Sequence, residues 1–319
     1  MPAVSAERQP TGTAFALRDP LPWGDLATIV RAAEQAGFVA LFLPEITGRD
    51  AFVTLGALAG ETRDLLLGTG VVPMRSRTLL LTAMAATTLQ ERSGGRLILG
   101  LGTGGVGTGA LEELRTRVLA TRQLLEGGTV EHEGGRLRLS LEIDTPAPIW
   151  ISALGPRAMR LAGEVADGVI LNWCTPERVA FARERIREGA ERAGRDPSFV
   201  TLSVYIRAWV GDDVEEAMPA LRAATAQYAA YPAYARQFQQ MGFGPEAAAA
   251  VGALRAGRPE AVSDGFVRAL CAFGDGAARH LRAYADAGAD LAVVYPVAVG
   301  EAARSVQRTL FALAPEVVD

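Results

Sequence analysis

The feature that most constrains this chain is a regular alternation of short apolar runs with segments of helical periodicity. Such alternation is typical of a parallel sheet whose strands are joined by helices. The runs that predict strands lie at residues 13–17, 39–43, 65–72, 96–101, 149–152, 169–171, 199–210 and 291–294. Eight strand–helix units predict an α/β fold of the (β/α)8 TIM-barrel type, and an open doubly wound sheet is the structural alternative.

Helical segments follow the strands in the expected order. Asp25 is a candidate N-cap for the first helix, and Gly37 is expected to end it. Further helices are expected around residues 52–58, 78–92, 110–125, 156–165, 176–192 and 300–313. Residues 212–259 exceed what one strand–helix unit needs. We therefore predict a single domain over residues 1–319, with a helical insertion at about 212–259.

Composition narrows the possible chemistry. All 32 basic residues are Arg, and the chain holds no Lys, two His and two Cys. Lys Schiff-base chemistry, a phosphate loop built on Lys and zinc sites with several His and Cys ligands are therefore excluded. The two Cys, Cys174 and Cys271, lie too far apart in sequence for a redox motif. A net charge of −4 gives no basic field for nucleic acid.

Cellular location can also be predicted. Residues 1–13 lack the apolar segment of a signal peptide, and no run approaches 18 uninterrupted apolar residues. Two Cys in a chain of this size fit a reducing compartment. We therefore expect a cytoplasmic protein without a membrane span.

In a parallel barrel the functional site lies at the carboxyl ends of the strands. Glu45 directly follows the second strand, either as a functional carboxylate in the barrel mouth or as a helix-capping or solvated one. The third strand contains Gly68 and Gly70. Glycines inside a strand mark a bulge or a close backbone approach, so we expect a ligand near this strand end.

The loop after the fourth strand is rich in glycine. Gly102, Gly104 and Gly107 satisfy the G-x-G-x-x-G pattern of dinucleotide-binding folds. That pattern belongs to the first strand–helix turn of such folds, whereas this turn is the fourth. We therefore interpret the loop as an opening for a flat cofactor, with a nicotinamide-dependent enzyme as the competing interpretation.

The turn Ala153-Leu154-Gly155-Pro156 follows the fifth strand and opens a helix. Pro at the first helical position leaves backbone N–H groups at the positive end of the helix dipole, which can hold a phosphate without Lys. The competing interpretation is an ordinary strand–helix turn.

Other side chains are ambiguous from sequence. Trp173 follows the sixth strand and either walls a pocket or belongs to the core. Cys174 is expected to be a buried, inert thiol. Arg207 could bind an anion, although most Arg are solvated. We expect His132 and His280 on the surface.

Several segments together resemble the luciferase-like flavin-dependent oxidoreductases. They are LGTGVVPMRSRTLLLTAMAATTLQERSGGRLILGLGTG (67–104), ISALGPRAMRLAGEVADGVILNW (151–173), YPAYARQFQQMGFG (231–244) and FGDGAARHLRAYADAGADLAVVYPV (273–297). The resemblance extends over nearly the whole chain after about residue 20. The subgroup that the chain resembles most uses the deazaflavin coenzyme F-420 rather than FMN.

The resemblance implies a homodimeric TIM barrel with the deazaflavin or flavin ring at its C-terminal end. It also implies a bulge at Gly70-Val71, often with a non-proline cis peptide, behind the ring. The family's cofactor contacts correspond here to Glu45, Gly70, Val71, Met74, Gly102, Thr103 and Gly104, and its phosphate contacts to Ala153, Leu154, Gly155 and Pro156. Trp173 and the insertion aromatics Tyr228, Tyr231 and Tyr234 are expected to cover a small-molecule substrate.

The chain departs from the family at two places. Ile46 and Gly105 stand where some deazaflavin members carry a His and a Glu. Glu45 is then the only matched ionisable candidate for catalysis. We predict hydride transfer between coenzyme F-420 and an organic substrate. The alternatives are an FMN-dependent monooxygenase that relies on a partner reductase, and a barrel that binds a ligand without turnover.

Overall fold

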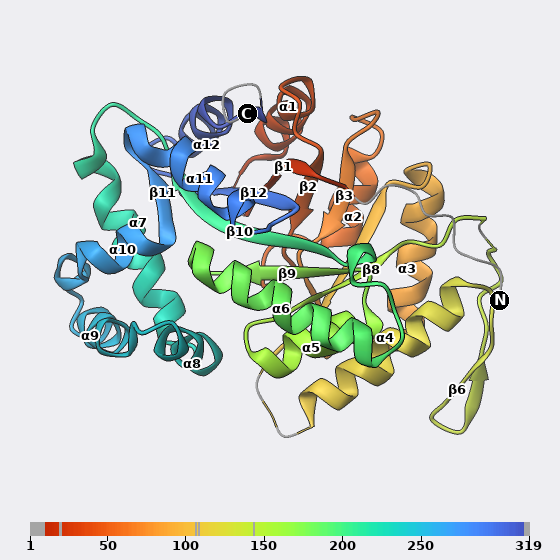
Figure 1. Cartoon of the computed structure of the whole chain (residues 1–319). Coiled ribbons are helices and arrows are strands. Elements are labelled where there is room, and N and C mark those ends of the chain that lie inside the picture. The colour runs from red at the N-terminus through yellow and green to blue at the C-terminus, as the bar shows by residue number, and fades with distance from the viewer. Residues whose placement is uncertain (1–9, 19–20, 106, 108, 143, 316–319) are drawn as a thin grey trace.

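A closed barrel of parallel strands forms the centre of the computed structural model, which describes residues 10–18, 21–105, 107, 109–142 and 144–315 (Figure 1). In barrel order the strands are β1 (Gly12–Ala16), β2 (Ala40–Leu43), β3 (Leu66–Thr69), β5 (Leu97–Gly102), β8 (Ile149–Ser152), β9 (Gly168–Asn172), β10 (Thr201–Trp209) and β12 (Leu291–Pro296). Strand β12 pairs with both β10 and β1 and so closes the barrel. The predicted (β/α)8 barrel is confirmed, and the open sheet is excluded.

Helices surround the barrel. They are α1 (Trp23–Gln35), α2 (Ala51–Leu58), α3 (Leu79–Arg92), α4 (Ala110–Leu125), α5 (Pro156–Val165), α6 (Pro176–Arg192), α11 (Ala277–Asp286) and α12 (Ala302–Ala312). Helices α4, α5 and α6 have the predicted bounds. The prediction that Asp25 caps α1 was wrong, because α1 begins two residues earlier and Asp25 lies in its first turn. A carboxylate there still interacts favourably with the helix dipole.

The barrel interior is filled mainly by aromatic side chains. Phe42 packs against Trp150 and Tyr205, and Tyr205 meets Tyr295 edge-on, with ring centroids 5.7–5.9 Å apart. Aliphatic side chains fill the separate layer between the strands and the helices. The barrel is therefore a packed core, and ligands can reach it only at its ends.

Four further helices lie together on one side of the barrel (Figure 1). They are α7 (Val214–Ala229), α8 (Pro232–Gln240), α9 (Gly244–Arg255) and α10 (Asp264–Leu270). They share a hydrophobic cluster with Trp173 and Trp209 of the barrel, and within it Phe238 meets Phe266 edge-on with ring centroids 5.1 Å apart. The predicted insertion at 212–259 covers α7 to α9, and the cluster continues into α10.

Four further short strands lie in the described part of the chain. Strands β6 (Val130–His132) and β7 (Gly135–Leu137) form a separate antiparallel hairpin between α4 and β8. Strand β4 (Val72–Pro73) pairs with β5. Strand β11 (Cys271–Phe273) pairs with β10 and was not predicted. No helix in the described part of the chain is long and apolar enough to cross a membrane.

Candidate functional site

The third barrel strand is interrupted at its carboxyl end. Strand β3 stops at Thr69, the Gly70–Val71 peptide bond is cis, and the chain then continues as β4. The Thr69 hydroxyl donates to the Gly100 carbonyl at 2.9 Å and accepts from the Gly100 N–H at 2.8 Å, which fixes the interruption against β5. The bulge and the cis peptide that the resemblance implied are therefore both present.

Tyr205 supports the interruption from inside the barrel. Its hydroxyl lies where a Cβ on Gly70 would have to be, only 1.8 Å from that position, so only glycine fits there. The same hydroxyl is buried and has no hydrogen-bond partner among the described residues. Burial raises the pKa of Tyr205 well above its usual value, so the hydroxyl keeps its proton. Sequence reasoning did not single out Tyr205.

The ends of β4 and β5 meet beside the bulge. The Met74 N–H donates to the Gly102 carbonyl at 2.8 Å, and a Cβ on Gly104 would lie 2.9 Å from the Pro73 side chain. The Thr103 hydroxyl donates to the Gly105 carbonyl at 2.8 Å and so closes the turn on itself. The predicted contacts at Gly70, Val71, Met74, Gly102, Thr103 and Gly104 thus lie along one edge of the barrel mouth, with the Met74 side chain buried.

Helix α5 presents an uncapped N-terminus at the same mouth. Gly155 is the N-cap, no side chain caps it, and Pro156 is the first helical residue. The first-turn N–H groups of a helix have no acceptor within the helix, and nothing lies within 4 Å of where a Cβ on Gly155 would be. The Ala153 N–H donates to Ile170 and the Leu154 carbonyl accepts from Arg178, so neither of these groups is free.

Glu45 is tied into an ion pair. Its carboxylate accepts two hydrogen bonds from Arg77, both at 2.9 Å, and one from the Ala51 N–H at 3.2 Å. Arg77 also pairs with Asp50, and its hydrogen bonds to Glu45 raise the pKa of Arg77. The Glu45 N–H donates to the Val71 carbonyl at 3.3 Å. Glu45 therefore joins the end of β2 to the bulge with its carboxylate already engaged.

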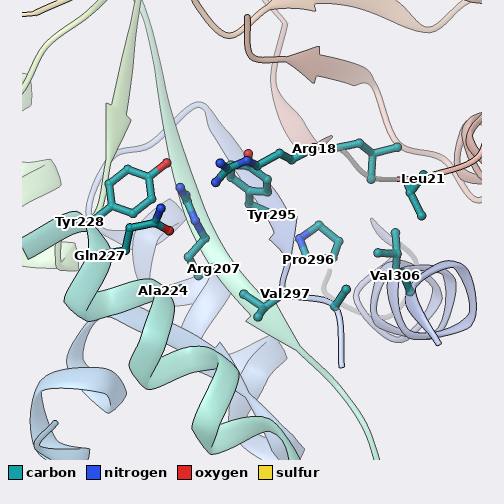
Figure 2. A pocket seen from close by; sticks show the side chains of 13 residues that line it. Arg18, Leu21, Arg207, Ala224, Gln227, Tyr228, Tyr295, Pro296, Val297 and Val306 are labelled. Carbon is teal, nitrogen blue, oxygen red and sulfur yellow. The ribbon is translucent and has the colours of Figure 1, made fainter. Parts of the chain in front are cut away.

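Arg207, on β10, is held in an aromatic cage at the other side of the mouth. Its guanidinium carbon lies 4.0 Å, 4.7 Å and 5.0 Å from the ring centroids of Tyr295, Trp173 and Tyr228, respectively. It donates to the Asn172 side-chain oxygen at 2.8 Å, and only 5% of the residue is exposed. Arg207 lines a pocket of about 210 Å³ between β10, β12, α7 and the end of β1 (Figure 2).

The predicted substrate aromatics lie in different environments. Tyr228 lines the Arg207 pocket and covers Trp173, with ring centroids 4.9 Å apart, so the Trp173 ring is buried beneath it. The Tyr234 hydroxyl accepts a hydrogen bond from the Asn172 side-chain amide at 2.7 Å. Tyr231 is half-exposed and packs against Tyr228 from outside the pocket lining. Tyr228 is the member of the group with direct access to the pocket.

The remaining candidates do not form a reactive cluster. Cys174 and Cys271 are buried as free thiols, and burial raises the pKa of each to about 12. The prediction of a surface His280 was wrong. Its ring meets Tyr284 edge-on, its Nε2 is buried without a partner among the described residues, and burial lowers its pKa. Helical periodicity alone did not reveal that this face of α11 is covered.

The chain is similar in sequence to several proteins of known name. The chain is 34% identical to a 5,10-methylenetetrahydromethanopterin reductase of Methanolobus tindarius over 66% of its own length and 68% of that protein. It is 33% identical to a putative coenzyme F420-dependent oxidoreductase of Mycobacterium tuberculosis, over 53% of its own length and 56% of that protein.

A solved structure shares the fold over nearly the full length. It is the coenzyme F420-dependent tetrahydromethanopterin reductase of Methanopyrus kandleri, which is 20% identical, with a TM-score of 0.78 and coverage of 96% of this chain and 98% of that one. The sequence model of the luciferase-like monooxygenases matches residues 3–291. The chain therefore belongs to the luciferase-like monooxygenase family.

Proposed function

We propose that this oxidoreductase transfers a hydride between coenzyme F-420 and a small organic substrate. The observation that carries the proposal is the combination, on one barrel mouth, of the Gly70–Val71 bulge and the uncapped start of α5. The first offers a close backbone approach to a flat ring, and the second offers N–H donors to a phosphate. Relatives named as F420-dependent oxidoreductases support this choice of coenzyme.

The described residues fit such a coenzyme. Beside the bulge, the Tyr205 hydroxyl is a buried donor without an acceptor, and a buried polar group in that state needs a partner. At α5, open space around Gly155 leaves room for a phosphate. When bound, the deazaflavin supplies the hydride chemistry, while the protein orients it and excludes water.

Each part of the chain then has a distinct task. The first turn of α5 would hold the phosphate, and the Tyr205 hydroxyl would be the donor nearest to the ring system at the bulge. Because the Glu45 carboxylate is engaged by Arg77 and Ala51, we assign it the orienting role rather than proton transfer. Tyr228, with Trp173 beneath it, covers the substrate side. The predicted homodimer, the cofactor-supplying reductase and the cytoplasmic location stay predictions.

The direct test is a titration of purified protein with reduced coenzyme F-420 and, separately, with reduced FMN, followed by fluorescence. We expect saturable binding of F-420 and weaker binding of FMN. Failure of both to bind would refute the proposal.

A pair of variants tests the phosphate site. Gly155 has extended backbone angles at an N-cap, where Asp and Asn are both favoured. We expect Gly155→Asp to weaken F-420 binding at least tenfold, since its carboxylate repels the phosphate, and Gly155→Asn to weaken it much less. Thermal unfolding should show that neither variant destabilises the protein. Equal affinities of the two variants would place the phosphate elsewhere.

An FMN-dependent monooxygenase is the second candidate. The observation that favours it is the exposed apolar side chain of Ile46 and the absence of a side chain at Gly105, where some deazaflavin members carry ionisable groups. Preferential binding of reduced FMN, with substrate-dependent oxygen consumption, would identify this activity. Tight coenzyme binding without turnover on a broad substrate panel would instead indicate a non-catalytic barrel.

A further inference from the structure

Arg207 is a buried cation without a counter-charge. Among the described residues its only hydrogen-bond acceptor is the side-chain oxygen of Asn172, and no carboxylate pairs with it. The rings of Tyr295, Trp173 and Tyr228 stabilise the cation through their faces, yet they cannot accept its remaining N–H groups. A buried charge in this state is energetically unfavourable unless a ligand of opposite charge pairs with it.

The pocket beside Arg207 is open to such a ligand. Its 13 lining residues within the described part of the chain include two Arg, Arg18 and Arg207, and no Asp or Glu. In Figure 2 both guanidinium groups lie at the end of the pocket near Tyr228 and Gln227. The opposite end is apolar, and the side chains of Leu21, Pro296, Val297 and Val306 lie there (Figure 2).

We propose that this pocket binds an oxyanion, a carboxylate or a phosphate ester, that is attached to a short apolar chain. Arg207 supplies a planar fork of N–H donors, which matches two oxygens of either group. Asn172 holds one of its terminal nitrogens and so fixes the plane of the fork. The apolar end accommodates the chain by hydrophobic burial.

The placement of the pocket assigns this anion to the substrate. Strands β10, β12 and β1 border the pocket, whereas the α5 turn follows β8, which stands two, three and four positions from them around the barrel. The proposed phosphate site and the pocket therefore belong to different strand ends of the mouth. This assignment rests on the proposed function, and it narrows the substrate to an organic acid or an organic phosphate.

Calorimetric titration of the full-length protein, without coenzyme, tests the pocket. The probes are hexanoate, hexyl phosphate and the neutral hexanamide. We expect saturable binding of hexanoate or hexyl phosphate, with the better of the two identifying the kind of oxyanion, and at least tenfold weaker binding of hexanamide. Binding of hexanamide as tight as that of the anions, or binding of none of the three, would overturn the proposal.

Substitutions at Arg207 test whether this residue binds the anion. We expect Arg207→Met to lose at least tenfold in affinity for the anion and Arg207→Lys to lose less. Arg222→Met is the matched control, because Arg222 lies on α7 but pairs with Asp264 away from the pocket. Unchanged anion binding in Arg207→Met would overturn the proposal.

A second route covers the case in which Arg207→Met fails to fold. Ala224→Leu adds bulk to the pocket wall from α7 and leaves the aromatic cage unchanged. It should abolish anion binding, and unchanged binding there would also overturn the proposal. Because these titrations contain no coenzyme, they are independent of the F-420 titration. If the protein binds the anion through Arg207 but does not bind F-420, the proposed F-420-dependent function is refuted and the proposed anion-binding pocket is supported.

Discussion

At the residue scale, two buried arginines of the barrel mouth, Arg77 and Arg207, differ in the charge of the groups around them. Arg77 pairs with the carboxylates of Glu45 and Asp50, whereas Arg207 contacts three aromatic rings and one amide oxygen and pairs with no carboxylate among the described residues. A cation with its own carboxylate contributes to the architecture of the site, and a cation without one attracts a ligand. Their surroundings therefore predict different results when each is removed.

Removing Arg77 should mainly cost stability. Only 11% of its side chain and 14% of that of Glu45 are exposed, so Arg77→Met leaves a buried carboxylate unpaired. We expect a loss of about 3 kcal/mol in the free energy of unfolding, measured with urea. Arg31→Met is the control, because its ion pair with Glu61 is largely exposed and should contribute less than about 1 kcal/mol. Equal losses in the two variants would contradict this assignment.

Individual residues show where prediction from the sequence stops. Glu45 and the α5 turn could be located because each directly follows a strand, and the Gly70-Val71 bulge because glycines lie inside the third predicted strand. Arg77 was missed, since its partner Glu45 lies 32 residues away and no local pattern encodes the pair. Tyr205 could have been found, because residues two apart in a strand share a face, and Tyr205 therefore shares the barrel interior with Arg207.

At the element scale, helices α5 and α6 pack closely through glycine. A Cβ on Gly163 would lie 2.0 Å from the Ile186 carbonyl oxygen, and a Cβ on Gly189 would lie 2.0 Å from the Arg160 carbonyl oxygen. The backbones therefore approach more closely than any side chain permits. This contact fixes α5, whose N-terminus is the proposed phosphate site.

Gly189→Ala should separate the two helices. We expect a loss of about 2–3 kcal/mol in unfolding free energy, because the methyl group overlaps a rigid backbone oxygen. Weaker F-420 binding should accompany it if α5 shifts. Gly56→Ala is the matched control: Gly56 lies inside α2 with nothing within 4 Å, and alanine there should stabilise by about 0.5–1 kcal/mol. Gly189→Ala as stable as the parent would show that the helices can move apart freely.

Elements were predicted best where their signals are local. Helices α4, α5 and α6 have the bounds expected from their periodicity, and α5 and α6 also begin with Pro. Strand β11 was missed because it is three residues long and depends on pairing with the distant β10. The separation of the third strand into β3 and β4 was expected as a bulge, since Gly70 lies within an otherwise continuous apolar run.

At the scale of the whole molecule, the insertion has a hydrophobic cluster distinct from those of the barrel, although Trp209 of β10 belongs to it. Phe238 is fully buried in the insertion core between Phe266 and Tyr234. Regions with their own core can open without the rest of the protein. The insertion also supplies Tyr228 and Gln227 to the Arg207 pocket, so such opening would expose the substrate side of the site.

Phe238→Ala should loosen the insertion selectively. We expect faster hydrogen exchange in α8 and α9, by a factor that corresponds to about 3–5 kcal/mol, with little change in β1 to β3. Phe181→Ala on α6 is the control, because Phe181 is partly exposed and contributes less to a core. A uniform increase in exchange over the whole chain would show instead that the two cores unfold as one unit.

The closure of the barrel by β1 and β12 also has a consequence for folding during translation. Strand β1 pairs on one side with β2, but its other edge pairs with β12, from Gly12 opposite Leu291 to Phe15 opposite Val294. Contacts between residues this far apart in sequence form slowly. During translation this edge of β1 stays without its partner until residues 291–294 have left the ribosome, so a nascent chain that lacks them presents an open strand edge to chaperones and to aggregation.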